Sequence, residues 1–228
     1  MELRNYKDKE EMSSAVTDFT ATLIKEITNS GRVFTLAVSG GTSPVRFYEL
    51  LAKESLDWSK VKLLLVDERK VDQSHIDSNA GMVHKSLVSK IDIPSENIIF
   101  PDTSISNPAA CAEEYERRIC SHFGTDLPVI DLVALGVGPD GHIASLFPNE
   151  DFDPDDKRLI ISTKAPAQFK VAERITMTLN AINKGTMRIF VIAGKGKQDM
   201  IQRTMSGDKS IPAGFIKDPC LIYTDSTT

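Results

Sequence analysis

The chain has 228 residues, of which 41% are hydrophobic, so it can bury a sizeable core, and we expect one domain over residues 1–228. A formal net charge of -5 gives no basic surface of the kind that binds nucleic acid. The first residues lack the apolar core of a signal peptide, and no segment approaches the ~20 apolar residues of a membrane span, so we expect a cytoplasmic protein without a membrane partner.

Apolar periodicity divides the chain into alternating helices and strands. Apolar residues between Met12 and Ile27 recur at steps of three and four, which predicts an amphipathic helix that ends at Gly31. Asn107 followed by Pro108 is typical of a helix start. In chain order we expect a helix over 12–27, a strand over 33–38, a helix over 44–51, a strand over 61–66, a helix over 79–88, a strand over 97–100, a helix over 107–123, and strands at 130–135, 159–162, 175–179, 188–193 and 220–223.

These strands are continuous apolar runs separated by helices, which is typical of a parallel sheet covered on both faces. The predicted fold is therefore α/β, a three-layer αβα sandwich with a mainly parallel, Rossmann-like sheet. In such a sheet the ligand lies beyond the carboxyl ends of the strands. Three unusual segments follow predicted strands and should meet there: residues 39–43, 67–69 and 136–142.

The segment Ser39-Gly40-Gly41-Thr42-Ser43 joins a strand to a helix. Paired glycines allow backbone N–H groups to approach an anion at the positive end of the helix, so one interpretation is a phosphate cradle. The other is a tight turn with Ser43 as the helix cap. The loop alone does not distinguish between these two interpretations.

The segment from Gly136 to Gly141 matches the dinucleotide-binding pattern G-x-G-x-x-G. We reject that interpretation because Pro148 leaves too little room for the expected helix, and because no acidic residue ends the next strand. Pro139-Asp140-Gly141 is also a good turn sequence. His142 follows this turn directly, where an imidazole can transfer protons at physiological pH; the alternative is a structural or solvated histidine. The remaining histidines, His75, His84 and His122, lack such a context and are expected on the surface or on helices.

Charged side chains follow or precede other strands. Asp67 and Arg69 flank Glu68, so they can face a crevice together while Glu68 points elsewhere; a structural ion pair is the alternative. Arg174 and Lys195 can add positive charge at the same edge, although an isolated cation of this kind is more often solvated.

Other kinds of site have no motif support. The cysteines, Cys111, Cys120 and Cys220, show no Cys-x-x-Cys spacing, so we expect buried apolar filler rather than disulfides or a zinc site. The sequence has no Gly-x-Ser-x-Gly nucleophile elbow and no His-Glu-x-x-His pair. We therefore expect no metal and no cofactor, and water attack aided by a general base remains open.

Taken together, the segments 39–44, 67–69 with Ser78-Asn79, and 136–148 resemble the 6-phosphogluconolactonase family over nearly the whole chain. The resemblance implies hydrolysis of 6-phospho-D-glucono-1,5-lactone to 6-phosphogluconate, in the oxidative pentose phosphate pathway and without an organic cofactor. It implies a small phosphorylated sugar lactone as the partner, and we expect a monomer. By matching positions, it implies His142 as the proton-transfer residue and Asp67 as the site carboxylate, with Gly40, Gly41 and Thr42 as the substrate loop and Arg69, Arg174 and Lys195 as substrate- or phosphate-binding cations.

Two departures and two rivals accompany this resemblance. Ile143 and Asp72 stand where the family commonly has Thr and Pro, and neither change removes a chemical group. The related glucosamine-6-phosphate deaminases have the same fold, but Phe147 stands at their carboxylate position and Arg69 replaces their tyrosine. The second rival is a sugar-phosphate-sensing module, which usually carries a DNA-binding segment that this acidic chain does not show.

Overall fold

The computed structural model describes residues 1–125, 128–148 and 152–225. Its main element is a seven-stranded sheet of β1 (Glu2–Asn5), β2 (Phe34–Val38), β3 (Val61–Leu65), β5 (Ile98–Ile99), β6 (Leu132–Leu135), β9 (Met187–Ile192) and β10 (Cys220–Thr224). The strand order is β1-β10-β9-β6-β2-β3-β5, and all neighbouring strands pair in parallel. The predicted α/β fold with a mainly parallel sheet is confirmed.

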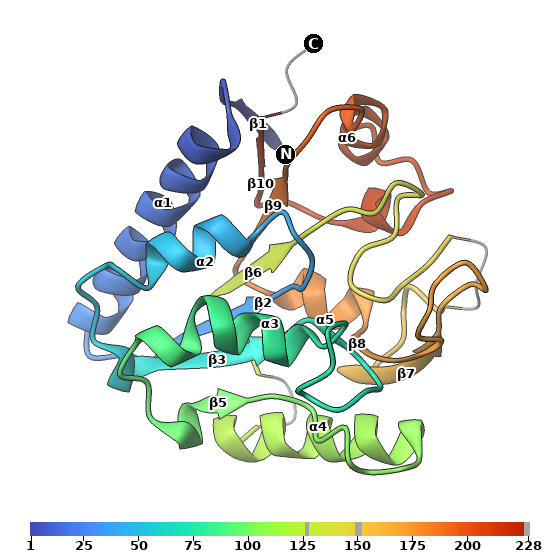
Figure 1. Cartoon of the computed structure of the whole chain (residues 1–228), viewed down its shortest axis with the longest axis horizontal. Helices are drawn as coiled ribbons and strands as arrows, with labels where there is room; N and C mark the ends of the chain where they lie inside the picture. The colour runs from blue at the N-terminus through green and yellow to red at the C-terminus, as the bar shows by residue number, and fades with distance from the viewer. Residues whose placement is uncertain (126–127, 149–151, 226–228) are drawn as a thin grey trace.

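Helices cover both faces of this sheet. They are α1 (Lys9–Asn29), α2 (Val45–Leu51), α3 (Asn79–Ser86), α4 (Pro108–Phe123), α5 (Leu179–Lys184) and α6 (Gln198–Met205). Figure 1 shows α1, α2 and α3 on one side of the sheet and α4 on the other. Side chains of β3 alternate between the two cores: Leu63 and Leu65 pack with α1, α2 and α3, whereas Leu64 packs with α4 and α5. Because both faces are buried, the central strands are largely apolar, whereas the edge strand β1 is mostly polar and exposed.

The long helices begin where the sequence predicts. Asp8 accepts a hydrogen bond from the Glu11 backbone N–H (2.9 Å) at the start of α1, and Asn107 accepts one from Ala110 N–H (3.0 Å) at the start of α4. These caps satisfy backbone donors that the first turn of a helix leaves without partners. The capped helix over 107–123 is confirmed.

A second, smaller sheet was not distinguished in the sequence. It contains β4 (Asp67–Arg69), β8 (Glu173–Met177) and β7 (Ile160–Lys164), paired antiparallel in that order. The chain passes from the main sheet to this one at Val66, whose N–H donates to Val38 O and whose carbonyl accepts from Met177 N–H. The segment 67–69 is therefore a strand of its own rather than the end of the preceding strand.

Short elements account for most other differences. The sequence pattern did not predict β1, α5, α6 or the 3₁₀ turns η1 (Trp58–Lys60), η2 (Val88–Lys90), η3 (Ser95–Asn97) and η4 (Pro212–Phe215). Leu179 was expected to end a strand but begins α5, because the Thr178 side chain accepts a hydrogen bond from Ala181 N–H and caps the helix. Six residues are too few for apolar periodicity to reveal a helix.

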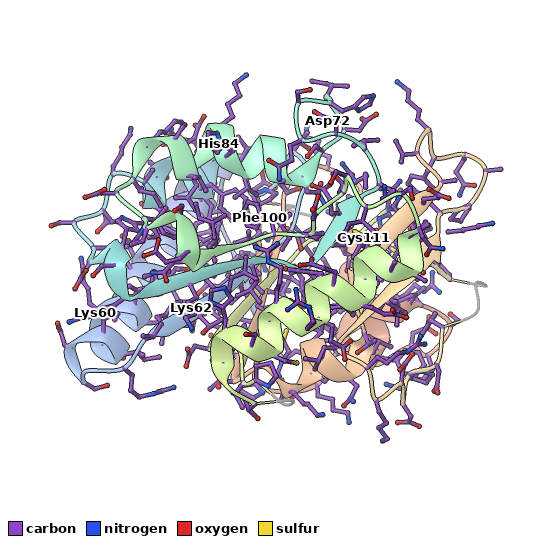
Figure 2. All side chains as sticks on the ribbon, turned by 90° about the horizontal axis from the view of Figure 1, so that it is seen from below. Lys60, Lys62, Asp72, His84, Phe100 and Cys111 are labelled. Atoms are coloured by element: carbon purple, nitrogen blue, oxygen red, sulfur yellow. The ribbon has the colours of Figure 1, made fainter. Side chains whose placement is uncertain are left out.

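The remaining histidines and most of the cysteines lie where the sequence predicts. His75, His84 and His122 are exposed, and Figure 2 shows His84 on the outer side of α3. Burial raises the pKa of the Cys111 thiol to about 11 and that of Cys220 to about 12, which suits apolar filler. Cys120 is only half-buried. Within the described residues, the structure contains no helix with the length and apolar character needed to cross a membrane.

Candidate active site

The three segments singled out in the sequence meet at one cavity of about 360 Å³ at the carboxyl ends of β2, β3 and β6. Its lining includes residues 39–44 after β2, Asp67 and Arg69 of β4, residues 136–139 and His142 after β6, Phe169, and Lys197 after β9. Larger hollows of about 820 and 970 Å³ occur elsewhere, but they do not gather these loops. The position matches the general rule that ligands bind open α/β sheets at this edge.

A tight turn presents His142 to the cavity. Gly138 N–H donates to His142 O (2.8 Å), and Gly141, with φ +86°, donates its N–H to Gly138 O (3.1 Å). A side chain at Gly138 would collide with Cε1 and Nδ1 of the imidazole. Gly138 therefore allows the histidine ring to approach the backbone, and Gly141 supplies the left-handed conformation of the turn.

Asp140 holds the imidazole from one side. Its Oδ1 lies 2.5 Å from His142 Nδ1 and also accepts from the His142 backbone N–H at 3.2 Å. An ionised carboxylate only accepts hydrogen bonds, so the proton of the neutral ring belongs on Nδ1 and the lone pair on Nε2. The sequence predicts Asp140 only as a turn residue; its place two residues before His142 is the signal that could have identified it.

Two aromatic rings complete the surroundings of His142. The Phe147 ring lies 4.8 Å from the imidazole centroid, and Phe169 lies 5.5 Å away with an interplanar angle of 86°. The two phenylalanines are 5.0 Å apart. The imidazole is thus fixed by a carboxylate, a glycine backbone and two rings, while its side chain keeps 19% of its surface exposed.

Asp67 lies in the cavity wall but contacts other groups. It is 6% exposed, its Oδ2 accepts from Ser145 Oγ–H (2.7 Å), and its Oδ1 accepts from Asn79 Nδ2–H (3.3 Å). Ala144, beside Ser145, has φ +50°, a conformation that costs an L-residue roughly 1–2 kcal/mol. We infer that Asp67 holds this strained segment in place through Ser145; within the described residues the hydrogen bond to the imidazole comes from Asp140.

Glu68 points away from the cavity, as predicted from its flanking residues. Its carboxylate accepts from the N–H groups of Asn79 and Ala80 (both 2.7 Å) and from Ser78 Oγ–H (3.0 Å) at the start of α3. Burial raises the pKa of Glu68, and these hydrogen bonds to the charged form oppose that effect. Glu68 therefore anchors α3 and, with it, the wall of the cavity that Asn79 contributes.

Arg69 and Arg174 occupy directly paired positions of β4 and β8, so both side chains lie on the same face of the small sheet. Arg69 donates from Nη1 to Asp77 O (2.6 Å). Arg69 lines the cavity, whereas Arg174 is only 5% exposed and lies outside the lining. The Nε atoms of both arginines are buried without a hydrogen-bond partner. Burial and the neighbouring Arg69 lower the pKa of Arg174. Among the described residues neither forms an ion pair, so the expected alternative of an Asp67–Arg69 pair does not occur.

On the loop after β9, Lys197 and not Lys195 lines the cavity. Lys197 lines the cavity and donates from Nζ to Val137 O (3.2 Å), whereas Lys195 is exposed and outside the lining. Gly194 and Gly196 both adopt positive φ. In Gly-Lys-Gly-Lys, the sequence alone could not show which lysine these glycines turn inward.

The loop after β2 contributes Gly40, Gly41 and Thr42 to the lining, as expected. A side chain at Gly40 would overlap the Asn79 amide, which explains glycine there. The interpretation of Ser43 as a helix cap is wrong, because α2 begins at Val45 without a side-chain cap and Ser43 Oγ instead accepts from Ala193 N–H at 3.4 Å. The interpretation as a phosphate cradle stays a prediction.

Comparisons with known proteins agree with this geometry. A family profile described as glucosamine-6-phosphate isomerases/6-phosphogluconolactonase matches residues 7–222. A 6-phosphogluconolactonase of Nostoc sp. is 36% identical over 198 residues, covering 84% of this chain and 80% of the relative. One of Thermotoga maritima is 35% identical over 182 residues, covering 80% and 79%. A crystal structure of the Thermotoga maritima enzyme superposes with a TM-score of 0.85 at 28% identity, covering 98% of each chain.

The fold and the site define an α/β protein with a polar cavity at the carboxyl edge of its sheet, and the chain belongs to the glucosamine-6-phosphate isomerase/6-phosphogluconolactonase family. Within that family, the relatives named above are 6-phosphogluconolactonases. The resemblance read from the sequence segments is confirmed.

Proposed function

We propose that this chain is a 6-phosphogluconolactonase that hydrolyses 6-phospho-D-glucono-1,5-lactone to 6-phospho-D-gluconate in the oxidative pentose phosphate pathway, with His142 as the proton-transfer group. The observation that carries the proposal is the setting of His142. Its Nδ1 is held by Asp140, and its ring lines a cavity shared with Arg69 and Lys197. A base and cations at one cavity suit a substrate that carries both an electrophilic carbonyl and an anion.

The chemistry needs one water molecule and one group that can transfer a proton in both directions. Nε2 of neutral His142 accepts a proton as the water oxygen attacks the lactone carbonyl carbon, which forms a tetrahedral intermediate. The resulting imidazolium returns a proton to the ring oxygen as the bond between that oxygen and the carbonyl carbon breaks. The Asp140 carboxylate, 2.5 Å from Nδ1, stabilises the positive ring between the two steps.

We assign the substrate phosphate to the cations of the site. Arg69 and Lys197 line the cavity, and Arg174, which lies outside its lining, is paired with Arg69 across the small sheet. These side chains carry guanidinium and ammonium donors, and charge-assisted hydrogen bonds to phosphate are among the stronger kinds. The loop residues from Gly40 to Thr42 supply backbone to the same cavity. Asp67 is the proposed site carboxylate, and it acts by holding the segment that carries Ser145.

Glucosamine-6-phosphate deamination is the alternative within the family. Here Phe147 stands where that resemblance expects a carboxylate, and its ring packs 4.8 Å from the His142 centroid. The discriminating assay supplies fresh 6-phosphogluconolactone and, in parallel, glucosamine 6-phosphate. We expect acid release above spontaneous lactone hydrolysis and no ammonia from the amino sugar; the reverse result would overturn the proposal.

The proposal also covers the setting of the enzyme: one domain over residues 1–228, a monomer in solution, and a cytoplasmic location. Relatives from Arabidopsis thaliana and rice are named as chloroplastic, so the location of this chain needs a test of its own. Light scattering of the purified chain tests the monomer, and imaging of the tagged protein in its own cell tests the location.

Lys197 and Lys195 provide a matched pair for a test of phosphate binding. We expect Lys197→Ala to raise KM for the phosphorylated lactone about 10-fold, because a charge-assisted bond contributes roughly 1.5–3 kcal/mol and 1.4 kcal/mol corresponds to tenfold. Lys195→Ala should leave KM unchanged, because that side chain is exposed and outside the cavity. Equal effects of the two substitutions on KM would contradict the assignment.

Turnover is expected to be independent of added metal. Among the described residues, no three His, Cys, Asp or Glu side chains form a group able to hold a metal ion. A chelator should therefore leave the initial rate unchanged. Loss of activity in chelator that zinc restores would contradict a mechanism in which His142 alone activates water.

A further inference from the structure

We propose that Phe169 is a positioning residue that holds both the imidazole of His142 and the guanidinium of Arg174. The inference rests on the proposed function, because it concerns the group that activates water and a group that binds phosphate. Phe169 lies in the loop between β7 and β8, is half-buried, and lines the cavity. Phe169 could not be identified from the sequence, because an isolated aromatic residue in a loop forms no recognisable pattern.

The contact with His142 restrains the ring on a side that Asp140 does not reach. The centroid distance of 5.5 Å and the interplanar angle of 86° give an edge-to-face pair, a favoured aromatic geometry. Phe147 contacts both rings, at 4.8 Å from His142 and 5.0 Å from Phe169. Phe169 therefore limits tilting of the imidazole and keeps Nε2 aimed at the cavity.

The contact with Arg174 holds a cation without occupying its donors. Cζ of Arg174 lies 5.9 Å from the Phe169 ring centroid, within the range of a cation–π interaction. A carboxylate would hold this guanidinium more strongly, but it would accept hydrogen bonds from the N–H groups that a phosphate needs. An aromatic face avoids that competition, which fits the buried Nε of Arg174 that lacks a partner.

The loop that carries Phe169 is itself held by hydrogen bonds. Ala165 N–H donates to Ala172 O (2.7 Å) and closes the loop, and Phe169 N–H donates to Pro166 O (3.0 Å) within it. The ring is therefore presented from a defined turn. Its loss should affect two kinetic constants separately: kcat through His142, and KM for the phosphorylated substrate through Arg174.

The test compares Phe169→Ala, Phe169→Leu and Phe169→Tyr with a matched control, Phe215→Ala. Phe215 makes the same kinds of contact away from the cavity: a cation–π contact with Lys209 (4.5 Å) and an edge-to-face pair with Phe152 (6.0 Å, 87°). Each variant is assayed on 6-phosphogluconolactone and on unphosphorylated gluconolactone, and its affinity for inorganic phosphate is measured by calorimetry.

For Phe169→Ala we expect kcat to fall about 3- to 10-fold on both lactones, the range of one aromatic pair. We expect KM to rise about 3- to 10-fold on the phosphorylated lactone alone, with a similar loss of phosphate affinity. Phe169→Tyr should restore both constants. Phe169→Leu should leave KM high because it lacks a π face, and Phe215→Ala should behave as wild type.

Wild-type kinetics in Phe169→Ala, or full restoration by Phe169→Leu, would overturn the inference, as would equal losses in Phe215→Ala. These outcomes leave the proposed function intact when the wild-type enzyme hydrolyses the lactone. If the wild-type enzyme does not hydrolyse the lactone, the proposed function fails. The affinity for inorganic phosphate then tests the Arg174 contact alone, and an unchanged affinity in Phe169→Ala would overturn the role of Phe169 in holding Arg174.

Discussion

Replacement of His142 by alanine is expected to lower kcat by about 10²- to 10⁴-fold, the contribution typical of a positioned general acid–base group. The ring is held by Asp140 at 2.5 Å and by Phe147 and Phe169, so its place at the cavity does not depend on the substrate. KM should change little, because His142 acts on water and the ring oxygen rather than on the phosphate. Steady-state kinetics on freshly prepared 6-phosphogluconolactone, corrected for spontaneous hydrolysis, measure both constants.

The control for this substitution is His84→Ala, because His84 is exposed on α3 and outside the cavity. It should retain wild-type kcat. Circular dichroism and Tm should show that His142→Ala stays folded, since most of the core lies elsewhere. A folded His142→Ala enzyme with near-wild-type kcat would mean that the histidine is structural.

Removal of Arg174 is expected to have the largest effect on substrate choice. Arg174 is 5% exposed, its Nε has no hydrogen-bond partner, and no described carboxylate forms an ion pair with it, so we expect it to bind an anion. Charge-assisted bonds of roughly 1.5–3 kcal/mol correspond to an increase in KM of about 10- to 100-fold in Arg174→Ala for the phosphorylated lactone. KM for unphosphorylated gluconolactone, which should be a poor substrate of the wild type, should change little, and the gap between the two lactones should narrow.

Two further variants separate charge from packing. Arg174→Met retains apolar bulk against Phe169 and should show the same change in KM, with Tm equal to or above that of wild type, because a buried charge without a partner is unfavourable. Arg117→Ala removes an exposed arginine of α4 and should change KM for neither lactone. Equal losses on both lactones in Arg174→Ala would show that this arginine does not recognise the phosphate.

The fold could be predicted where the sequence pattern is local. Continuous apolar runs identify the buried parallel strands, and Asn107 with Pro108 marks the start of α4. The small antiparallel sheet could not be predicted, because β4 pairs with a strand far along the chain, and an apolar run looks the same in either sheet. The six residues of α5 are likewise too short to show a helical period.

The candidate site likewise contains residues that local sequence patterns predict and residues that only the tertiary structure brings together. His142 and the glycine loops follow strands directly, so the predicted turns and strand ends were enough to predict that they meet at one edge of the sheet. The partners of His142 depend on tertiary structure: Asp140 was read only as part of a turn, and Phe169 reaches the imidazole from a distant loop. The choice of Lys197 over Lys195 depends on the backbone turn at Gly194 and Gly196, which composition does not specify.

The central claim is that neutral His142 accepts the proton of the attacking water. Its most direct test is the pH dependence of kcat/KM for 6-phosphogluconolactone, measured on the wild-type enzyme and on His142→Gln with spontaneous hydrolysis subtracted at each pH. Because a general base must be unprotonated to accept a proton, wild-type kcat/KM should rise with pH by the loss of one proton. The residual activity of His142→Gln should lack this rise. The same rise in the variant would contradict the assignment of His142 as the base.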